Sequence, residues 1–275
     1  MLVSKLETPL KPRDLRLMGI FLNFSSDDKH GCSKNCSFCV FKNKPQYMCP
    51  TVEDVNDFLF QYSQNNLAKS VVLSGGGDPL YNFEQNKDKV LAIINCIKKF
   101  EYQIIVQSYE LDIIDKYCDS LLKDVSYYIF STEVCDPKLI ALADKLLSMG
   151  KTVVMEKVFN FDTTWGAADL EAAKNWIYYY EKHSSKLNIH ENYLYCLTAE
   201  ENKKLYIYFA HYFERQVNYL MHQNCRTRYL VLINNEVWAP YDYIHKVLLN
   251  DFDEIEAKFK ADPNKALMNW YTFKF

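Results

Sequence analysis

Long apolar runs are missing from this chain of 275 residues, and so is any excess of positive charge. Its apolar stretches, such as VLAIINCI and YLVLI, are far shorter than the ~20 residues that a membrane-spanning helix needs. The first residues, MLVSKLETPLKPRDLR, hold no continuous apolar core of the kind that signal peptides contain. With a formal net charge of -3, the composition gives no strong signal for nucleic-acid binding. These absences favour a cytoplasmic protein without a membrane partner.

Glycine and histidine are also scarce. Three of the 7 glycines are consecutive, at Gly75, Gly76 and Gly77, which indicates a sharp backbone turn or the close approach of a ligand. The 6 histidines are scattered and form no metal-site spacing. The 9 cysteines of a cytoplasmic chain are typical of thiols and metal ligands rather than of a disulfide framework.

Hydrophobic residues make up 49% of the chain, enough for the core of one domain of α/β-barrel size. Short apolar segments alternate with amphipathic segments of helical period, which predicts a parallel sheet with right-handed crossovers. The expected strands are residues 15–25, 70–74, 102–108, 125–132, 151–159 and 189–197. The expected helices are residues 52–64, 86–100, 110–122, 137–150, 167–183 and 198–216. A β-hairpin over 225–240, turning at Asn234 and Asn235, and a helix over 241–261 follow.

Two short motifs carry the chemistry. Cys32, Cys36 and Cys39 form a CxxxCxxC motif, with Phe38 just before the last cysteine. Three thiolates so close together can bind one metal centre, but a structural zinc site normally has four protein ligands. A cubane iron–sulfur cluster held by three cysteines instead leaves one iron open for a substrate or cofactor. The second motif is the run SVVLSGGGDPL over residues 70–80, which by itself indicates only a strand-to-helix turn.

In this order and spacing, the two motifs resemble those of the radical SAM superfamily. The resemblance implies an α/β fold, a partial (β/α)6 TIM-like barrel over residues 1–224, with a C-terminal hairpin and helix cap over residues 225–275. It implies a [4Fe–4S] cluster on Cys32, Cys36 and Cys39, with S-adenosyl-L-methionine bound to the open iron. In the family, the reduced cluster cleaves this cofactor to a 5′-deoxyadenosyl radical, which abstracts hydrogen from a substrate. An electron donor such as flavodoxin or ferredoxin, and exclusion of oxygen, are implied as well.

The resemblance also suggests cofactor-binding residues. Phe38 would pack near the adenine, and the turn would hold the methionine end, mainly through backbone carbonyls. The residues of that turn are Gly75, Gly76, Gly77, Asp78 and Pro79, where Asp78 replaces the usual and longer Glu. Ser131 and Glu133, after the fourth expected strand, resemble a pair that binds ribose hydroxyls or the methionyl group, and Lys157 could pair with a carboxylate. No catalytic residue follows from the sequence.

Several alternatives stay open. Glu133 and Lys157 could form a plain ion pair, and His30 or Cys49 could complete a zinc site in a non-catalytic interaction module. A peptide, protein or small-molecule substrate is marginally favoured because no separate recognition domain is evident, and a nucleotide or nucleic-acid base is the alternative. Cys225 precedes the hairpin with no cysteine after it, so no auxiliary cluster is expected. The remaining cysteines within apolar patterns are expected in the core, namely Cys96, Cys118, Cys135 and Cys196.

Overall fold

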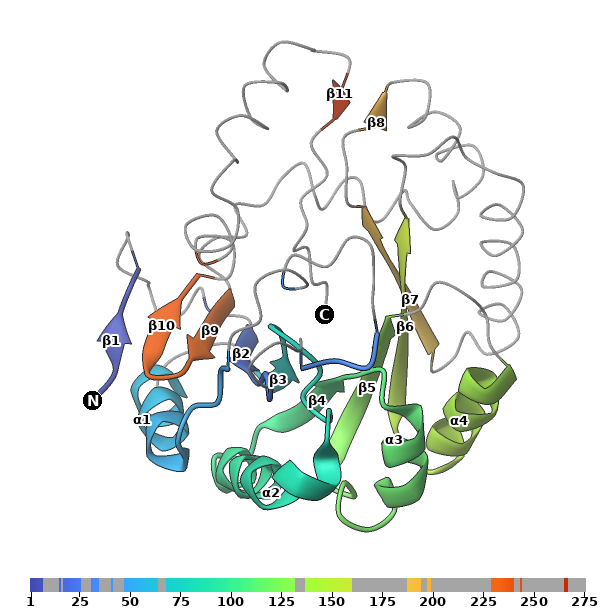
Figure 1. Ribbon diagram of the computed structural model, residues 1–275, viewed down its shortest axis with the longest axis horizontal. Coiled ribbons are helices and arrows are strands. Elements are labelled where there is room, and N and C mark those ends of the chain that lie inside the picture. Colours follow the sequence, from blue (N-terminus) through green and yellow to red (C-terminus); the bar gives the residue numbers. More distant parts are fainter. Residues whose placement is uncertain are drawn as a thin grey trace.

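The structure is a computed structural model, and it describes residues 1–6, 15, 17–25, 31–34, 41, 47–63, 68–131, 137–159, 187–193, 197–198, 229–239, 243 and 265–266. For residues 131, 155–159, 187–193, 197–198 and 265–266 it describes the backbone alone. Within these ranges the fold is mixed α/β (Figure 1). None of the described helices is long and apolar enough to cross a membrane.

The strands are β1 Val3–Ser4, β2 Leu17–Phe21, β3 Ser70–Ser74, β4 Gln103–Gln107, β5 Val125–Ser131, β6 Thr152–Phe159, β7 Leu187–Tyr193, β8 Leu197–Thr198, β9 Tyr229–Ile233, β10 Glu236–Trp238 and β11 Lys265–Ala266. The helices are α1 Val52–Ser63, α2 Phe83–Lys99, α3 Leu111–Tyr117 and α4 Pro137–Ser148. Each expected strand from β2 to β7, and each expected helix that falls on described residues, is thereby confirmed.

Nine strands form one sheet in the order β1-β10-β9-β2-β3-β4-β5-β6-β7. From β2 to β7 the neighbours are parallel and follow the chain, and β9 lies parallel to β2 on its other side. Over the described residues the sheet is open, with β1 and β7 at its edges. Closure into a barrel is therefore not observed. The parallel strands bring their carboxyl ends to one edge of the sheet.

All four described helices pack on the same face of this sheet (Figure 1). Apolar residues of α1, α2, α3 and α4 form one core with alternate strand residues, including Met18, Ile20, Val71 and Leu73. The residues between them belong to the other face, where Leu17, Val72, Ile105, Ile129 and Val154 form a second apolar cluster. Both faces of the central strands are buried, which explains why these strands read as continuous apolar runs.

The helix termini follow from local sequence. Thr51 precedes α1, and its Oγ1 accepts a hydrogen bond from the Asp54 backbone N–H at 3.1 Å. Asp54 reciprocates by accepting the Thr51 backbone N–H at 3.2 Å, so the two side chains satisfy two donors that the first helical turn leaves free. At the other end of the helical region, Gly150 follows α4 with a φ of 77°, the left-handed conformation that commonly ends helices.

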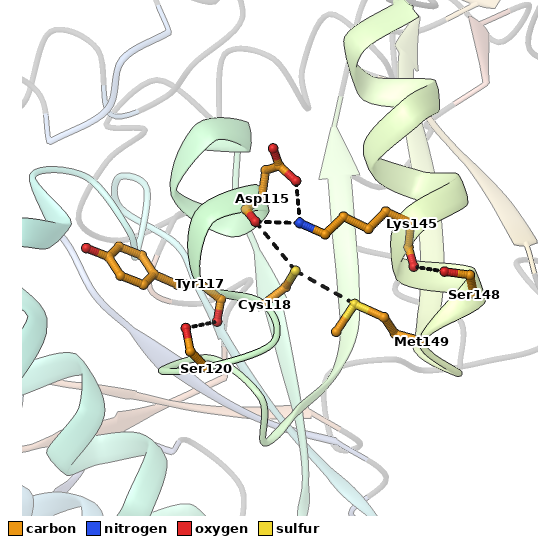
Figure 2. Close-up of polar contacts among 7 residues, drawn as sticks. All are labelled: Asp115, Tyr117, Cys118, Ser120, Lys145, Ser148 and Met149. Carbon is orange, nitrogen blue, oxygen red and sulfur yellow. Dashed lines mark hydrogen bonds and ion pairs between the residues drawn. The ribbon is translucent and has the colours of Figure 1, made fainter.

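The α3–α4 contact is polar at its rim and apolar within (Figure 2). Lys145 of α4 donates to both the backbone oxygen and Oδ1 of Asp115, each at 2.7 Å. Cys118 lies beneath this pair, fully buried, with its Sγ 3.8 Å from Met149 Sδ. Cys96 is buried as well, which confirms the expected core role of both cysteines.

The C-terminal hairpin is confirmed, and it continues the main sheet. β9 and β10 pair antiparallel around Asn234, whose φ of 53° is the positive value that the sequence predicted. β9 also pairs with β2, and β10 pairs with β1, a strand that the sequence did not predict because Val3–Ser4 is too short to show alternation. The helices expected over 167–183, 198–216 and 241–261 lie outside the described residues.

Gly19 of β2 provides a test of this packing. A Cβ at this position would overlap Tyr229 Oη and lie 2.9 Å from a ring carbon of the same side chain. We expect Gly19→Ala to lower the free energy of unfolding by about 1–3 kcal/mol. In a Tyr229→Phe background the loss should be smaller, because the nearest clashing atom is gone. Urea unfolding of the four proteins in this double-mutant cycle measures the coupling, and equal losses in both backgrounds would contradict the assignment.

Candidate functional site

The site forms where β2 and β3 end. Beyond β2 the ladder continues for one residue, because Leu22 N–H donates to the Ser74 backbone oxygen at 3.0 Å. The start of the cysteine motif then lies against the glycine turn: the Asp78 backbone N–H donates to the Gly31 backbone oxygen at 2.7 Å. The two sequence motifs, about forty residues apart in the chain, are thus hydrogen-bonded neighbours.

Only the first part of the cysteine motif is described. Cys32 is half-buried, and its Sγ accepts a hydrogen bond from the Lys34 backbone N–H at 3.4 Å. Cys36, Cys39 and Phe38 lie outside the described residues. Within the described ranges, no three Cys, His, Asp or Glu side chains form a group that could hold a metal ion. The three-cysteine ligand set therefore stays a prediction.

The glycine turn is built for close packing. Gly75 and Gly76 have φ values of 74° and 76°, which side chains other than glycine rarely adopt. A Cβ on Gly75 would overlap the Phe21 ring, and one on Gly77 would overlap the Gly31 backbone oxygen. A Cβ on Gly76 would overlap Met48 Cε. Gly75 and Gly76 are required by conformation and all three glycines by space, and protein atoms fill that space.

Asn23, directly after β2, ties these segments together. Its side chain is fully buried and donates through Nδ2 to the Gly76 backbone oxygen at 2.8 Å. Its backbone exchanges two hydrogen bonds with Met48, at 2.7 and 3.0 Å. Its Oδ1 has no hydrogen-bond partner among the described residues and lies where a Cβ of Gly31 or Gly77 would be. The carbonyl oxygens of Gly75 and Gly77 likewise receive no hydrogen bond from the described residues.

Asp78 turns its side chain into the protein. The buried carboxylate accepts three hydrogen bonds, from Leu80 N–H at 2.8 Å, Ser108 Oγ at 2.7 Å and Tyr109 N–H at 2.5 Å. Ser108 Oγ in turn accepts the Glu110 backbone N–H at 3.0 Å. Asp78 therefore joins the glycine turn to the loop between β4 and α3, and both of its oxygens are engaged by protein donors.

Opposing effects of burial, hydrogen bonding and neighbouring charge set the pKa of Asp78. Its pKa is raised overall from 3.8 to about 6, because burial and the neighbouring Glu110 charge raise it by more than the hydrogen bonds from Tyr109, Leu80 and Ser108 lower it. Glu110 itself has one buried carboxylate oxygen, Oε1, that receives no hydrogen bond from any residue that the structure describes. Two carboxylates thus lie close to the glycine turn at the strand-end edge.

The pairing of β5, β6 and β7 shows which face of the sheet the other residues predicted at strand ends belong to. Ser131 of β5 is paired with Glu156 of β6, which is paired with His190 of β7, so the three form one row across neighbouring strands. This row belongs to the face of Ile129 and Val154, the face that carries none of the described helices. Lys157 is paired with Glu191 and belongs to the opposite face. Glu133 lies outside the described residues.

Cys49 takes part in the fold. Its backbone N–H donates to Asn234 Oδ1 at 3.0 Å, which links the segment before α1 to the hairpin. Burial raises the pKa of the Cys49 thiol, so its protonated form is favoured over the thiolate that a metal ligand needs. His30, the other residue considered as a fourth zinc ligand, lies outside the described residues.

An aromatic cluster supports the turn from the hairpin side. Phe21, which covers Gly75, makes edge contacts with Phe41 at 6.4 Å and with Tyr243 at 6.2 Å between ring centroids. Trp238 of β10 packs on Tyr243 at 5.5 Å. The Tyr243 hydroxyl donates to Met48 Sδ at 3.3 Å. The C-terminal hairpin is thereby packed against the same turn as the cysteine motif.

Sequence reasoning missed Asn23 and His190. Asn23 reads as one polar residue at the end of an apolar run, and only its position directly after a strand could have pointed to it. His190 lies in the least regular expected strand, where no motif marks it. Ser108 is the last residue of an expected strand, and its bond to Asp78 has no signal in the spacing of residues.

Comparisons with known proteins give little more. No family model and no curated protein matches the chain. Among solved structures, it is similar to the crystal structure of Streptococcus suis SuiB, with 14% sequence identity and a TM-score of 0.48. The match covers 90% of this chain and 66% of SuiB, so the chain spans just under two thirds of that protein. A likeness this distant carries no conclusion about activity.

Removing the Asp78 carboxylate should destabilise the site. In Asp78→Ala, two backbone N–H groups and the Ser108 hydroxyl lose a buried acceptor, so we expect the free energy of unfolding to fall by about 3 kcal/mol. Asp112→Ala is the matched control, because Asp112 is exposed and its one ion pair among the described residues is with Lys138. That control should lose less than about 1 kcal/mol. Urea denaturation followed by circular dichroism measures both, and similar losses would show that Asp78 is not a structural link.

The raised pKa of Asp78 also predicts a pH dependence. Between pH 3.8 and about 6 the unfolded chain has released the Asp78 proton while the folded chain retains it. Stability contributed by this residue is therefore greatest below pH 3.8 and falls until about pH 6. The wild-type unfolding free energy, taken relative to Asp78→Asn, should decrease by on the order of 3 kcal/mol over this interval. A difference that stays constant from pH 4 to pH 7 would refute the shift.

Proposed function

We propose that the protein is a radical SAM enzyme, with a [4Fe–4S] cluster on Cys32, Cys36 and Cys39 and S-adenosyl-L-methionine beside it. The observation that carries this proposal is the hydrogen bond from Asp78 N–H to the Gly31 oxygen, at 2.7 Å. It joins the residue before Cys32 to the glycine turn, so a ligand bound by the turn would lie next to the cysteine loop. A plain strand-to-helix turn gives no reason for this contact.

The topology supports a partial barrel. Strands β2 to β7 follow the chain in order, and all described helices lie on one face, as in singly wound barrels and unlike doubly wound sheets, which carry helices on both faces. In such folds ligands bind at the carboxyl ends of the strands. Cys32, the glycine turn and the Ser131 row all lie at that edge.

The chain's own groups have distinct tasks in this proposal. Cys32, Cys36 and Cys39 supply thiolates, and the free carbonyl oxygens of Gly75 and Gly77 can accept the methionyl amino group. Once bound, the cluster and S-adenosyl-L-methionine would supply reductive cleavage to methionine and a 5′-deoxyadenosyl radical, which abstracts hydrogen from the substrate. Asp78 holds the turn in place instead of contacting the amino group, because protein donors engage both of its carboxylate oxygens.

The substrate is best sought among polar molecules. The residues of this row, Ser131, Glu156 and His190, are polar and belong by register to the face opposite the helices. A flexible peptide or a small polar molecule fits that row, and a nucleotide or nucleic-acid base is the alternative. Among the described residues, Cys32, Cys49, Cys96 and Cys118 form no disulfide, which fits a reducing cytosol, where an oxygen-sensitive cluster would also be kept intact.

Metal content and cofactor cleavage test the proposal together. The protein is purified and reconstituted without oxygen, analysed for iron, sulfide and zinc, and incubated with dithionite and S-adenosyl-L-methionine. We expect about four irons per chain, a count taken from the cluster type, and formation of 5′-deoxyadenosine detected by mass spectrometry. Cys32→Ala should lose both the iron and the product.

Cys49→Ala is the matched control. Under the proposal it keeps iron and product formation, because Cys49 is not a ligand. A zinc-binding module that uses Cys49 would instead lose its metal in this variant and show zinc in the wild type. Bound zinc in place of iron, or an iron-loaded protein that never cleaves the cofactor with any reductant, would refute the enzyme.

A further inference from the structure

A tyrosine that follows the C-terminal hairpin is bonded to the segment that follows the cysteine motif. The Tyr243 hydroxyl donates to Met48 Sδ at 3.3 Å, and both residues are buried. On the hairpin side, the Tyr243 backbone N–H donates to the Ala239 oxygen at 3.1 Å. The Tyr243 ring also packs on Trp238 of β10, with 5.5 Å between the ring centroids. Tyr243 is therefore anchored to the hairpin and bonded to Met48.

Met48 closes the base of the segment that carries the cysteine motif. Its backbone exchanges two hydrogen bonds with that of Asn23, and all three cysteines of the motif lie between Asn23 and Met48 in the sequence. The Met48 side chain also packs on the glycine turn, because a Cβ on Gly76 would overlap Met48 Cε. One residue thus pins the end of the cysteine segment and covers the turn.

The bond from Tyr243 selects one conformation of the Met48 side chain. Methionine is unbranched and has three rotatable bonds, so packing alone does not fix where its Cε lies. The bond fixes the sulfur, and with it the Cε that covers Gly76. Burial, followed by the charge of Glu236, raises the pKa of Tyr243 to about 12. The hydroxyl therefore keeps the proton that it donates throughout the neutral pH range.

We propose that Tyr243 is a positioning residue, which acts through Met48 to hold the cysteine segment and the glycine turn in the arrangement that binds S-adenosyl-L-methionine. The inference rests on the proposed function, and it assigns a role at the site to a residue 195 positions after Met48. Without the bond, Met48 can leave Gly76 uncovered, and only a fraction of the molecules keeps the binding arrangement. The apparent affinity falls by that fraction, while the rate of the bound complex is unchanged.

The experiment compares cofactor affinity with the rate at saturation. The dissociation constant of S-adenosyl-L-methionine is measured by calorimetry on the reconstituted protein without oxygen. The rate of 5′-deoxyadenosine formation is measured at saturating cofactor with dithionite. Tyr243→Phe keeps the ring and removes only the hydroxyl. We expect its dissociation constant to rise about three- to tenfold, and its rate at saturation to stay within about twofold of the wild-type rate.

Tyr128→Phe is the matched control. Tyr128 is fully buried in the core between the sheet and the helices, and its hydroxyl donates to the Leu122 backbone oxygen at 3.3 Å. The same atom is removed, so the free energy of unfolding should fall by a similar amount in both variants. Leu122 precedes the amino end of β5, whereas the turn lies at the carboxyl ends of the parallel strands. The dissociation constant of the control should therefore change by less than about twofold.

A double-mutant cycle shows whether Met48 carries the effect. Met48→Leu keeps an apolar side chain but has no sulfur to accept the bond, so adding Tyr243→Phe should weaken binding by less than about twofold further. A dissociation constant that Tyr243→Phe leaves unchanged, or an equal further loss in the Met48→Leu background, would overturn the inference and leave the proposed function standing. Absence of cofactor binding by the iron-loaded wild type would refute the proposed function, and the inference with it.

Discussion

The arrangement of the loops at the carboxyl ends of the parallel strands depends on one buried side-chain amide, that of Asn23. Asn23 gives its backbone to Met48 and its Nδ2 to Gly76, while its Oδ1 lies against Gly31 and Gly77. A fully buried polar group is costly unless it is bonded, so this side chain fixes the distance between β2 and the turn after β3. Only glycine leaves room for its oxygen on both sides. The position of the cysteine segment follows from that fit.

A second link, through Asp78, extends the same edge to β4. Its carboxylate holds the loop between β4 and α3, while its backbone N–H holds Gly31. Asn23 and Asp78 together connect the carboxyl ends of β2, β3 and β4. Hydrogen bonds between the loops make this connection, and no helix takes part in it. The glycine run that stands out in the composition is explained by this packing. Protein atoms fill the space that the missing Cβ atoms leave, so it is not open to a ligand. A ligand at this turn would contact the backbone carbonyl oxygens.

Much of the fold could be predicted because the residues of each strand and helix indicate that element by themselves. Val71–Leu73 and Ile104–Val106 are buried on both faces, which gives continuous apolar runs in the sequence. Thr51 and Asp54, only three residues apart, cap the start of α1 through local hydrogen bonds. The turn at Asn234 could be predicted from the residue type, because asparagine tolerates the positive φ that the turn needs. β1 and the row from Ser131 to His190 could not be predicted, because strand order and register are set by contacts between distant segments. For the same reason, the engagement of Asp78 by Ser108 has no signature in the spacing of residues.

The electrostatics of this edge fit a cationic ligand. Burial and the Glu110 charge raise the pKa of Asp78 against three hydrogen bonds that only partly offset them, and Glu110 Oε1 receives no hydrogen bond from the part of the chain that the structure describes. Uncompensated negative charge in a buried setting costs stability that a nearby positive charge would restore. S-adenosyl-L-methionine carries a sulfonium and an ammonium group. Its binding in the turn would therefore lower the pKa of Asp78, and by linkage the ionised form of Asp78 would bind it more tightly.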